Sequence, residues 1–212
     1  MPRVTDDFLH SPAVGRPRDP VLEQAILDAT VEVVVGSGFS AAKVDEIARR
    51  ARTGKAAIYR RWPTKTALVI AAAQRLQGDV AVPDEGSLRE DLLACVRHYV
   101  SPDARTALIL ANVLAEAQQD PELREATITS IGQPPMEALR TVVERWIGRG
   151  EVDPSVPVDL VVSVAPSVAF HRVVVLHQAL DDTTAVALVD GVLLPALGVP
   201  RISGSGRTGP VS

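Results

Sequence analysis

The chain has 212 residues, of which 46% are hydrophobic, enough for one sizeable domain or two smaller ones with real cores. Its single cysteine, Cys95, excludes an internal disulfide, and the first 18 residues lack the apolar run of a signal peptide, so we expect a cytoplasmic location. The formal net charge is −4, yet residues 43–65 hold eight bases and two acids, whereas residues 76–212 hold ten arginines and eighteen acids. Opposite charges on two parts of one chain indicate separate partners, with a polyanion for the basic part.

The chain after residue 18 begins with one long predicted helix. Asp19 can accept hydrogen bonds from the free amides of a first turn, and Pro20 suits the first helical position. Apolar residues then recur at helical spacing until Gly36 and Gly38 end the pattern. The β-branched run at 31–35 has strand propensity, but the two preceding turns of helical periodicity favour a helix.

Two short helices separated by a three-residue turn are expected next. The first spans about Ala41–Ala51, and the second restarts after Arg52–Gly54 and ends near Trp62. Ile58, Tyr59 and Trp62 would lie on one side of the second helix. Two short helices joined in this way predict a helix-turn-helix.

The rest of the chain also shows helical patterns, which predicts an all-α fold. Thr64 can cap a helix that ends near Gln77, and Ser87 with Glu90 reaching back forms a capping box for the next one. Pro134 and Pro135 are expected to interrupt the helices, and Pro166 is expected to bend one. Further helices are expected near residues 102–118 and 121–131. Another should follow the two prolines and end at Arg149, and the last two should lie near residues 158–180 and 183–197.

The basic helix pair has the features that duplex DNA requires. In a helix-turn-helix the second helix lies in the major groove, while neighbouring basic side chains and helix amino ends hold phosphates. Ala56 and Ala57 are small enough for a close approach, and Tyr59 could pack its ring inward and give its hydroxyl to a phosphate. The nearby charges are Lys55, Arg60, Arg61 and Lys65. A solvated basic face on a structural helix pair explains these charges equally well.

The stretch GFSAAKVDEIARRARTGKAAIYRRWPTKTAL, with the arm GRPRDP before it, resembles the DNA-binding segment of the TetR family of transcriptional regulators. The landmarks that agree are Gly38, Phe39, Val44, Ile47, Ala48, Ala51, Lys55, Ile58, Tyr59, Trp62, Lys65 and Leu68. The resemblance covers about residues 19–70. It implies a ligand-responsive regulator, usually a repressor, that binds a palindromic operator as a homodimer and is released by a small-molecule effector. The implied parts are a flexible basic arm (1–18), a three-helix DNA-binding domain (19–65), a helical effector-binding and dimerisation domain (66–199) and a disordered tail (200–212).

By this resemblance, Lys43, Lys55, Tyr59 and Lys65 lie where family members contact phosphate. Residues 53–57, followed by Arg60 and Arg61, lie where bases are read or approached. The GRPR arm could lie along or into the minor groove, or be a flexible tail. The residues expected to contact DNA are Arg16, Arg18, Lys43, Arg52, Thr53, Gly54, Lys55, Ala56, Ala57, Tyr59, Arg60, Arg61 and Lys65.

Four residues depart from the family pattern: Ala42 replaces a threonine cap, Arg52 a turn glycine, Gly54 a serine and Ala57 a threonine or small polar residue. If the turn needs a left-handed residue at 52, arginine there costs about 1–2 kcal/mol relative to glycine. Thr53 or Ser40 could supply a missing cap. Extra arginines at 52, 60 and 61 would substitute charge for the missing neutral hydrogen bonds, which indicates a DNA reader that depends more on arginine than its relatives do.

The last two predicted helices are too apolar for one buried face each. Residues 157–197 are apolar at 25 of 41 positions, so the first of these helices must be covered by its own domain and by something else. The apolar run near Leu160–His171 is about twelve residues long, too short for a membrane span. The resemblance implies that these helices, about 158–197, form a four-helix bundle with a second subunit.

The middle helices would enclose the effector. The candidate contacts are His98, Tyr99, Asn112, Glu116, Trp146 and, on the dimer helix, His171, although residues of these types are more often surface or satisfied core residues. Aromatic residues make up only 3% of the chain, so a site for large planar cations is not indicated.

Enzymatic functions find little support in the sequence. The P-loop pattern GxxxxGK[ST], the GxSxG motif and Cys/His ligand spacings do not occur, so no cofactor and no metal are expected. Cys95 and His98 are three residues apart but lack an orienting third group, which favours packing over catalysis. The alternative function is a dimeric helical interaction protein whose degenerate helix-turn-helix no longer binds specific DNA.

Overall fold

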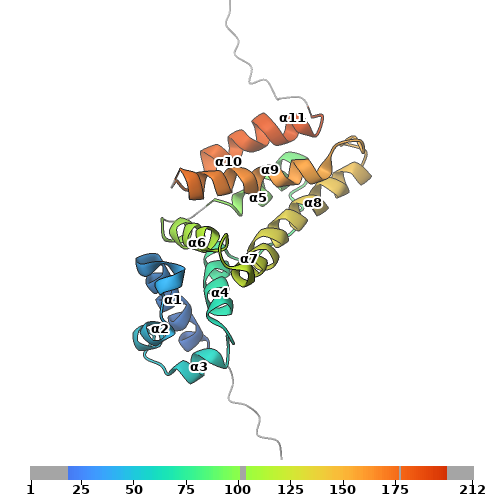
Figure 1. Ribbon diagram of the computed structural model, residues 1–212. Coiled ribbons are helices and arrows are strands. Elements are labelled where there is room, and N and C mark those ends of the chain that lie inside the picture. The colour runs from blue at the N-terminus through green and yellow to red at the C-terminus, as the bar shows by residue number, and fades with distance from the viewer. Residues whose placement is uncertain (1–18, 101–103, 177, 200–212) are drawn as a thin grey trace, which may run out of the picture.

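The computed structural model describes residues 19–100, 104–176 and 178–199, and this part of the chain is helical without a strand (Figure 1). The all-α prediction is therefore confirmed. The helices are α1 Pro20–Ala41, α2 Val44–Arg50, α3 Lys55–Tyr59, α4 Lys65–Gln77, α5 Leu88–Arg97, α6 Ala104–Glu116, α7 Pro121–Thr127, α8 Gln133–Gly148, α9 Val158–Phe170, α10 Asp182–Leu188 and α11 Leu194–Ala196. π-Helical turns follow α7, α9 and α10 at Ile128–Gly132, His171–Val175 and Val189–Leu193.

The helix starts follow the capping residues in the sequence. Asp19 accepts hydrogen bonds from the amides of Val21 and Leu22, and Thr64 accepts one from the amide of Ala67. α1 passes through Gly36 and changes direction at Gly38, whose φ of 79° is left-handed. The helical prediction for residues 31–35 is thus confirmed.

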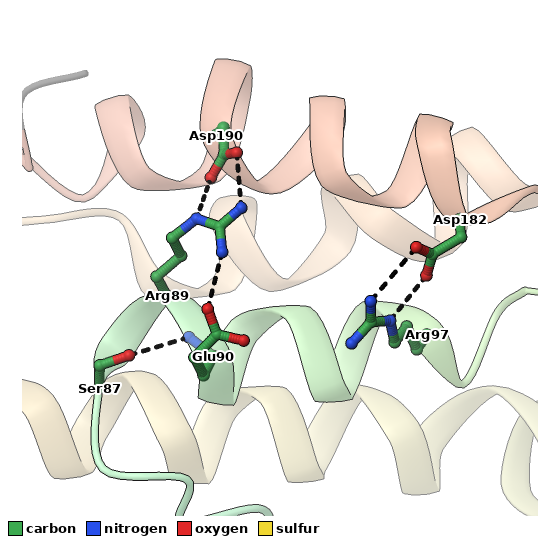
Figure 2. Close-up of polar contacts among 6 residues, drawn as sticks. All are labelled: Ser87, Arg89, Glu90, Arg97, Asp182 and Asp190. Atoms are coloured by element: carbon green, nitrogen blue, oxygen red, sulfur yellow. Dashed lines mark hydrogen bonds and ion pairs between the residues drawn. The ribbon is translucent and has the colours of Figure 1, made fainter. Parts of the chain in front are cut away.

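The capping box at the start of α5 is only half formed. The Ser87 hydroxyl accepts the amide of Glu90, but the Glu90 carboxylate bonds to Arg89 Nη1 at 2.7 Å (Figure 2). The carboxylate therefore pairs with its charged neighbour in place of the backbone amide of Ser87, because an arginine beside it offers a charge-assisted hydrogen bond.

The expected interruption at Pro134 and Pro135 is wrong. The π-helical turn Ile128–Gly132 leads directly from α7 into α8, and both prolines lie in the first turn of α8, where their missing amides do little harm. Pro134 has no N–H for the carbonyl of Ser130, four residues earlier, and Gln74 Nε2 of α4 donates to that carbonyl at 2.8 Å.

The first of the two C-terminal helices ends earlier than the expected residue 180. Helical structure continues through Pro166 and the π-helical turn to Val175, and α10 begins at Asp182 after an isolated bridge between Val100 and Leu180. The stretch Val158–Val175 has 18 residues and is long and apolar enough to cross a membrane by length and composition alone. The expectation that the apolar run is only about twelve residues long, and therefore too short for a membrane span, is wrong. Only 28% of this stretch is buried in the single chain.

Two hydrophobic clusters organise the molecule. The first joins α1–α4 with one side of α6 and α7, through residues such as Ile26, Ile58 and Ile109. The second joins α5 with α8–α11. α6 and α7 lie between the α1–α4 head and the upper layer of α5 and α8–α11 (Figure 1). The first cluster includes Leu68, so it extends past residue 65, and the division into domains at that residue stays a prediction.

A buried carboxylate supports the second cluster. Asp91 on α5 is fully buried and accepts hydrogen bonds from Arg145 Nη2 and Trp146 Nε1 on α8, both at 2.7 Å, and from the amide of Glu85 at 2.6 Å. Burial raises the pKa of Asp91, but these three hydrogen bonds outweigh it and hold that pKa below its ordinary value of 3.8. The network fixes α5 to α8 and holds the loop before α5.

Candidate nucleic-acid interface

The turn between α2 and α3 closes as a Schellman motif. The amide of Thr53 donates to the carbonyl of Ala48 at 2.9 Å, and the amide of Arg52 donates to that of Arg49 at 3.2 Å. Arg52 occupies the left-handed position of the motif with a φ of 52°, and it is the one residue other than glycine with a positive φ in the described part of the chain. The turn therefore keeps the geometry for which glycine is the usual residue.

The side chains of Ile58, Tyr59 and Trp62, which were expected on one side of the second short helix, differ in how far they are buried. Ile58 is fully buried and Trp62 packs against the first cluster, but Tyr59 is 45% exposed. The expectation that Tyr59 packs its ring inward is thus wrong, because Ile58 and Trp62 already fill the space beneath the short helix. Ala56 is exposed and Ala57 half-buried, so the outer face of α3 is open to a partner.

Neither short helix has a side-chain cap. The residues before α2 and α3 are Lys43 and Gly54, and neither makes a capping hydrogen bond from its side chain. The expectation that Ser40 or Thr53 supplies a cap is wrong, because the Ser40 hydroxyl donates to Glu116 Oε1 of α6 at 2.5 Å and Thr53 lies in the Schellman turn.

Acidic residues pair with several of the bases in this region. Arg49 and Arg50 both bond to Glu46, at 2.7 and 2.8 Å, and Arg50 also reaches Glu32 of α1 at 3.1 Å. Hydrogen bonds from the two arginines lower the pKa of Glu46 to about 2. Lys55 lies 2.9 Å from Asp45, and this hydrogen bond raises the pKa of the lysine.

Two further bases are directed into the protein. Lys65 Nζ donates to the carbonyls of Phe39 and Ser40, at 3.0 and 3.4 Å, and lies 4.4 Å from the centre of the Phe39 ring. Arg61 Nη1 donates to the carbonyl of Ala57 at 3.1 Å. Lys65 joins the end of α1 to α4, and Arg61 satisfies the last turn of α3.

Within residues 43–65, all of which the structure describes, three exposed cations keep their charge free. The side chains of Lys43, Arg52 and Arg60 make no ion pair or hydrogen bond to any residue that the structure describes. They flank the uncapped starts of α2 and α3 and the end of α3. Arg16 and Arg18 lie outside the described residues.

The expected effector residues do not converge on one cavity. Tyr99 lines a cavity of about 400 Å³ between α6, α8 and α9, and His98 lines two adjacent hollows of about 650 and 330 Å³. Trp146 is buried against Asp91, and His171 is exposed.

The other two expected effector residues face the α1–α4 head. Glu116 bonds to Ser40, and Asn112 donates to the carbonyl of Leu108 and lies next to Gly38. Both residues therefore belong to the contact between α6 and α1.

Sequence reasoning missed most residues of the 400 Å³ cavity. Its walls include Leu110 and Leu114 on α6, Met136 on α8, and Ser163 and Ser167 on α9. The two serines are one helical turn apart on a largely apolar helix, a spacing that could have placed them on one face. The other liners come from distant segments and carry no local signal.

Comparisons with known proteins give consistent matches. A family model described as "Bacterial regulatory proteins, tetR family" matches residues 26–72, and one described as "Tetracyclin repressor-like, C-terminal domain" matches residues 82–192. The HTH-type transcriptional regulator Rv1556 of Mycobacterium tuberculosis is 30% identical over 187 residues, covering 86% of this chain and 93% of the relative. The DNA-binding transcriptional repressor TetR of Mycobacteroides abscessus is 30% identical over 173 residues, covering 80% and 90%.

Solved structures share the fold. FadR from Bacillus subtilis, solved in complex with stearoyl-CoA, superposes with a TM-score of 0.62 at 22% identity and covers 82% of this chain and 97% of its own. A TetR-family regulator from Rhodococcus sp. superposes with a TM-score of 0.67 at 15% identity, covering 84% and 100%. At these identities the likeness supports the architecture alone.

Proposed function

Because the chain belongs to the tetR family of bacterial regulatory proteins, a ligand-responsive family of DNA-binding transcriptional regulators, we propose that the outer face of α3 and three free cations form its operator contact. The chain is a transcriptional regulator, and family members are typically repressors. The proposal assigns Lys43, Arg52 and Arg60 to phosphates and the exposed start of α3, Gly54–Ala57, to base edges.

The observation that supports this proposal is that some basic side chains in residues 43–65 are paired with acids whereas others are not. Exposed ion pairs such as Lys55–Asp45 contribute little to stability, so Lys55 can exchange Asp45 for a phosphate. Lys43, Arg52 and Arg60 need no exchange, because no described acid holds them. They are the groups that gain most when a phosphate approaches.

We assign dimer formation to the outer side of α9 and α10 together with the π-helical turns that follow them. Apolar side chains there stay open in the single chain: Leu160 is 66% exposed, Val175 58%, and Leu176 and Val192 44% each. An apolar surface of this extent, in a family whose members bind operators as dimers, fits contact with a second copy better than contact with water. A two-fold dimer would place two α3 helices in successive major grooves of a palindromic operator.

Ion pairs from α5 position α10 for this contact. Arg89 bonds to both carboxylate oxygens of Asp190, at 2.7 and 2.8 Å, and Arg97 does the same with Asp182, at 2.7 and 3.2 Å (Figure 2). The arginines lie two helical turns apart on α5 and reach acids eight residues apart on the C-terminal helix. Paired arginine contacts of this geometry fix orientation as well as distance.

Effector response is assigned to α6. Leu110 and Leu114 on this helix line the 400 Å³ cavity, and Glu116 at its end bonds to Ser40 beside α2. A ligand that displaces α6 would therefore change the position of the DNA-binding head. The cytoplasm is the compartment in which such a regulator would meet both operator and effector.

The test is DNA selection followed by a salt series. DNA bound by the wild-type protein is selected from a random pool, and the affinity for the selected duplex is measured at a series of salt concentrations. Removal of one cation from a phosphate reduces the slope of log affinity against log salt by about 0.9. Arg60→Ala removes one cation from each subunit, so by the same relation the slope should fall by about 1.8 in a dimer.

Arg61→Ala is the matched control. Its guanidinium donates to the Ala57 carbonyl, so this variant should change the slope by less than half as much as Arg60→Ala. If Arg60→Ala and Arg61→Ala reduced the salt slope equally, the assignment of Arg60 as a free cation and Arg61 as a bound one would be refuted. Absence of any protected sequence at low salt would refute operator binding and favour the interaction-protein alternative.

A further inference from the structure

The cavity between α6, α8 and α9 has walls of one chemical kind. Its volume of about 400 Å³ lies in the range of small-molecule sites, and the thirteen described residues that line it include no Asp, Glu, Lys, Arg or His. The polar side chains among them are Gln77, Tyr99, Ser163 and Ser167. A ligand in this space would therefore meet apolar walls and no counter-ion.

The hydroxyls of the cavity differ in what they can still donate. Ser163 Oγ donates to the carbonyl of Leu160, and Ser167 Oγ donates to the carbonyl of Ser163, both at 2.7 Å. Each serine has thus used its one hydrogen within α9. Tyr99 Oη is buried and has no hydrogen-bond partner among the described residues. A buried hydroxyl without a partner is unfavourable unless a ligand or water supplies one.

Tyr99 is held as a neutral donor. Its ring packs edge-to-face on the His98 ring at a centroid distance of 5.6 Å, which fixes its direction. Burial raises the pKa of the Tyr99 hydroxyl, and burial lowers the pKa of His98, so both rings are uncharged near neutral pH. Neither ring therefore supplies a positive charge to balance a carboxylate or a phosphate.

We propose that this cavity takes an uncharged, largely apolar effector with a carbonyl-type oxygen that accepts a hydrogen bond from Tyr99. The assignment as an effector site rests on the proposed function, since it requires that occupation of the cavity change operator binding. The wall residues Leu110 and Leu114 lie on α6, the helix that carries Glu116 to Ser40. An occupant therefore touches the element that contacts the DNA-binding head.

The ligand chemistry is tested by displacement of an uncharged fluorophore, N-phenyl-1-naphthylamine, from the full-length protein. Methyl decanoate and decanoate, at a pH where the acid is ionised, differ chiefly in the charge of the head group. The ester should displace the fluorophore at least about tenfold more effectively, because an ionised group without a counter-ion is disfavoured in an apolar cavity. Equal displacement by ester and carboxylate would overturn the proposal.

Tyr99→Phe removes only the donor. It should weaken ester binding about 2- to 10-fold, the usual net effect of one hydrogen bond, and leave fluorophore binding unchanged. Unchanged ester affinity would refute the role of Tyr99. Leu110→Trp, which fills the cavity, should abolish fluorophore binding, whereas Leu108→Trp, on the same helix but 46% exposed and not a lining residue, should not. Thermal unfolding of each variant confirms that it is folded.

Operator binding is measured on the same samples. If the wild-type protein binds the ester with the expected selectivity but keeps its affinity for the selected operator, the effector role is refuted while the ligand chemistry stands. If no selected DNA exists, the proposed function fails independently of the displacement results. Release of operator by methyl decanoate from the wild-type protein and from Leu108→Trp, but not from Leu110→Trp, is the result that supports the whole proposal.

Discussion

Replacement of Arg52 by glycine should raise stability and lower DNA affinity at the same time. Arg52 holds a φ of 52° in the Schellman turn, a conformation that costs a residue with a Cβ atom about 1–2 kcal/mol. Glycine removes this strain but gives the unfolded chain more freedom, which offsets about 0.5–1 kcal/mol. The difference between the two ranges is about 0–1.5 kcal/mol, so the expected net gain in the free energy of unfolding is about 0.75 kcal/mol.

Thermal unfolding at fixed protein concentration measures the first effect. For a chain of this length, 1 kcal/mol corresponds to about 2–4 °C, so Arg52→Gly should raise Tm by about 1–4 °C. Arg52→Ala removes the same charge and keeps the positive φ, so it should not share the gain. A Tm of the glycine variant at or below that of the alanine variant would refute the strain argument.

A salt series measures the second effect. The Arg52 side chain is exposed and bonds to no described residue, so its replacement removes two cations from a dimer. If both lie against phosphates, the salt slope falls by about 1.8 for the glycine and the alanine variants alike. A glycine variant that is more stable and binds DNA with an unchanged slope would show that Arg52 contributes strain and does not touch DNA.

Two further substitutions test the upper layer of the protein. Asp91→Asn should lower the free energy of unfolding by about 1–3 kcal/mol, because an asparagine side chain would leave donors of Arg145 and Trp146 poorly matched. The pKa of Asp91 is lowered in the folded state, so the stabilisation by its carboxylate is present above pH 3.8 and is lost as the pH falls through the folded pKa. The acid arm of a curve of stability against pH should therefore be flatter for Asp91→Asn than for the wild-type protein. An unchanged slope would show that the carboxylate has no such role. Leu160→Asp should convert a dimer to a monomer, as measured by sedimentation. The control Val82→Asp, at a residue that is 46% exposed in the loop before α5, should stay dimeric. A dimeric Leu160→Asp variant would exclude the Leu160 face as the dimer contact.

Local patterns predicted the elements whose causes are local. Asp19 with Pro20 and Thr64 marked the starts of α1 and α4, because a cap and the amides it satisfies lie within three residues. The left-handed turn at Arg52 followed from the family pattern, and the structure confirms it. The π-helical turn before Pro134 could not be predicted in this way, since the free carbonyl of Ser130 is satisfied by Gln74, 56 residues away.

The candidate site required contacts that no local window contains. A count over residues 43–65 includes Glu46 and Asp45 but not Glu32, which reaches Arg50 from α1. The same count treats Lys65 as free, although its ammonium group is bound to the end of α1. Charge density therefore points to the segment that the tetR family model matches, residues 26–72, but which cations are available depends on the packing of α1 against α2 and α4.

In the proposed function, α6 is the element that connects the effector cavity to the α1–α4 head. One side of the helix, through Ile109, Val113 and Ala117, is buried in the same cluster as α1 and α4. Its neighbours Leu110 and Leu114 form a wall of the apolar cavity. Because a close-packed core resists small displacements, a ligand that shifts this wall must either shift the α1–α4 head with it or break the contacts of α6 with that head. The change in operator affinity is then limited by the difference between the ligand affinities of the two arrangements.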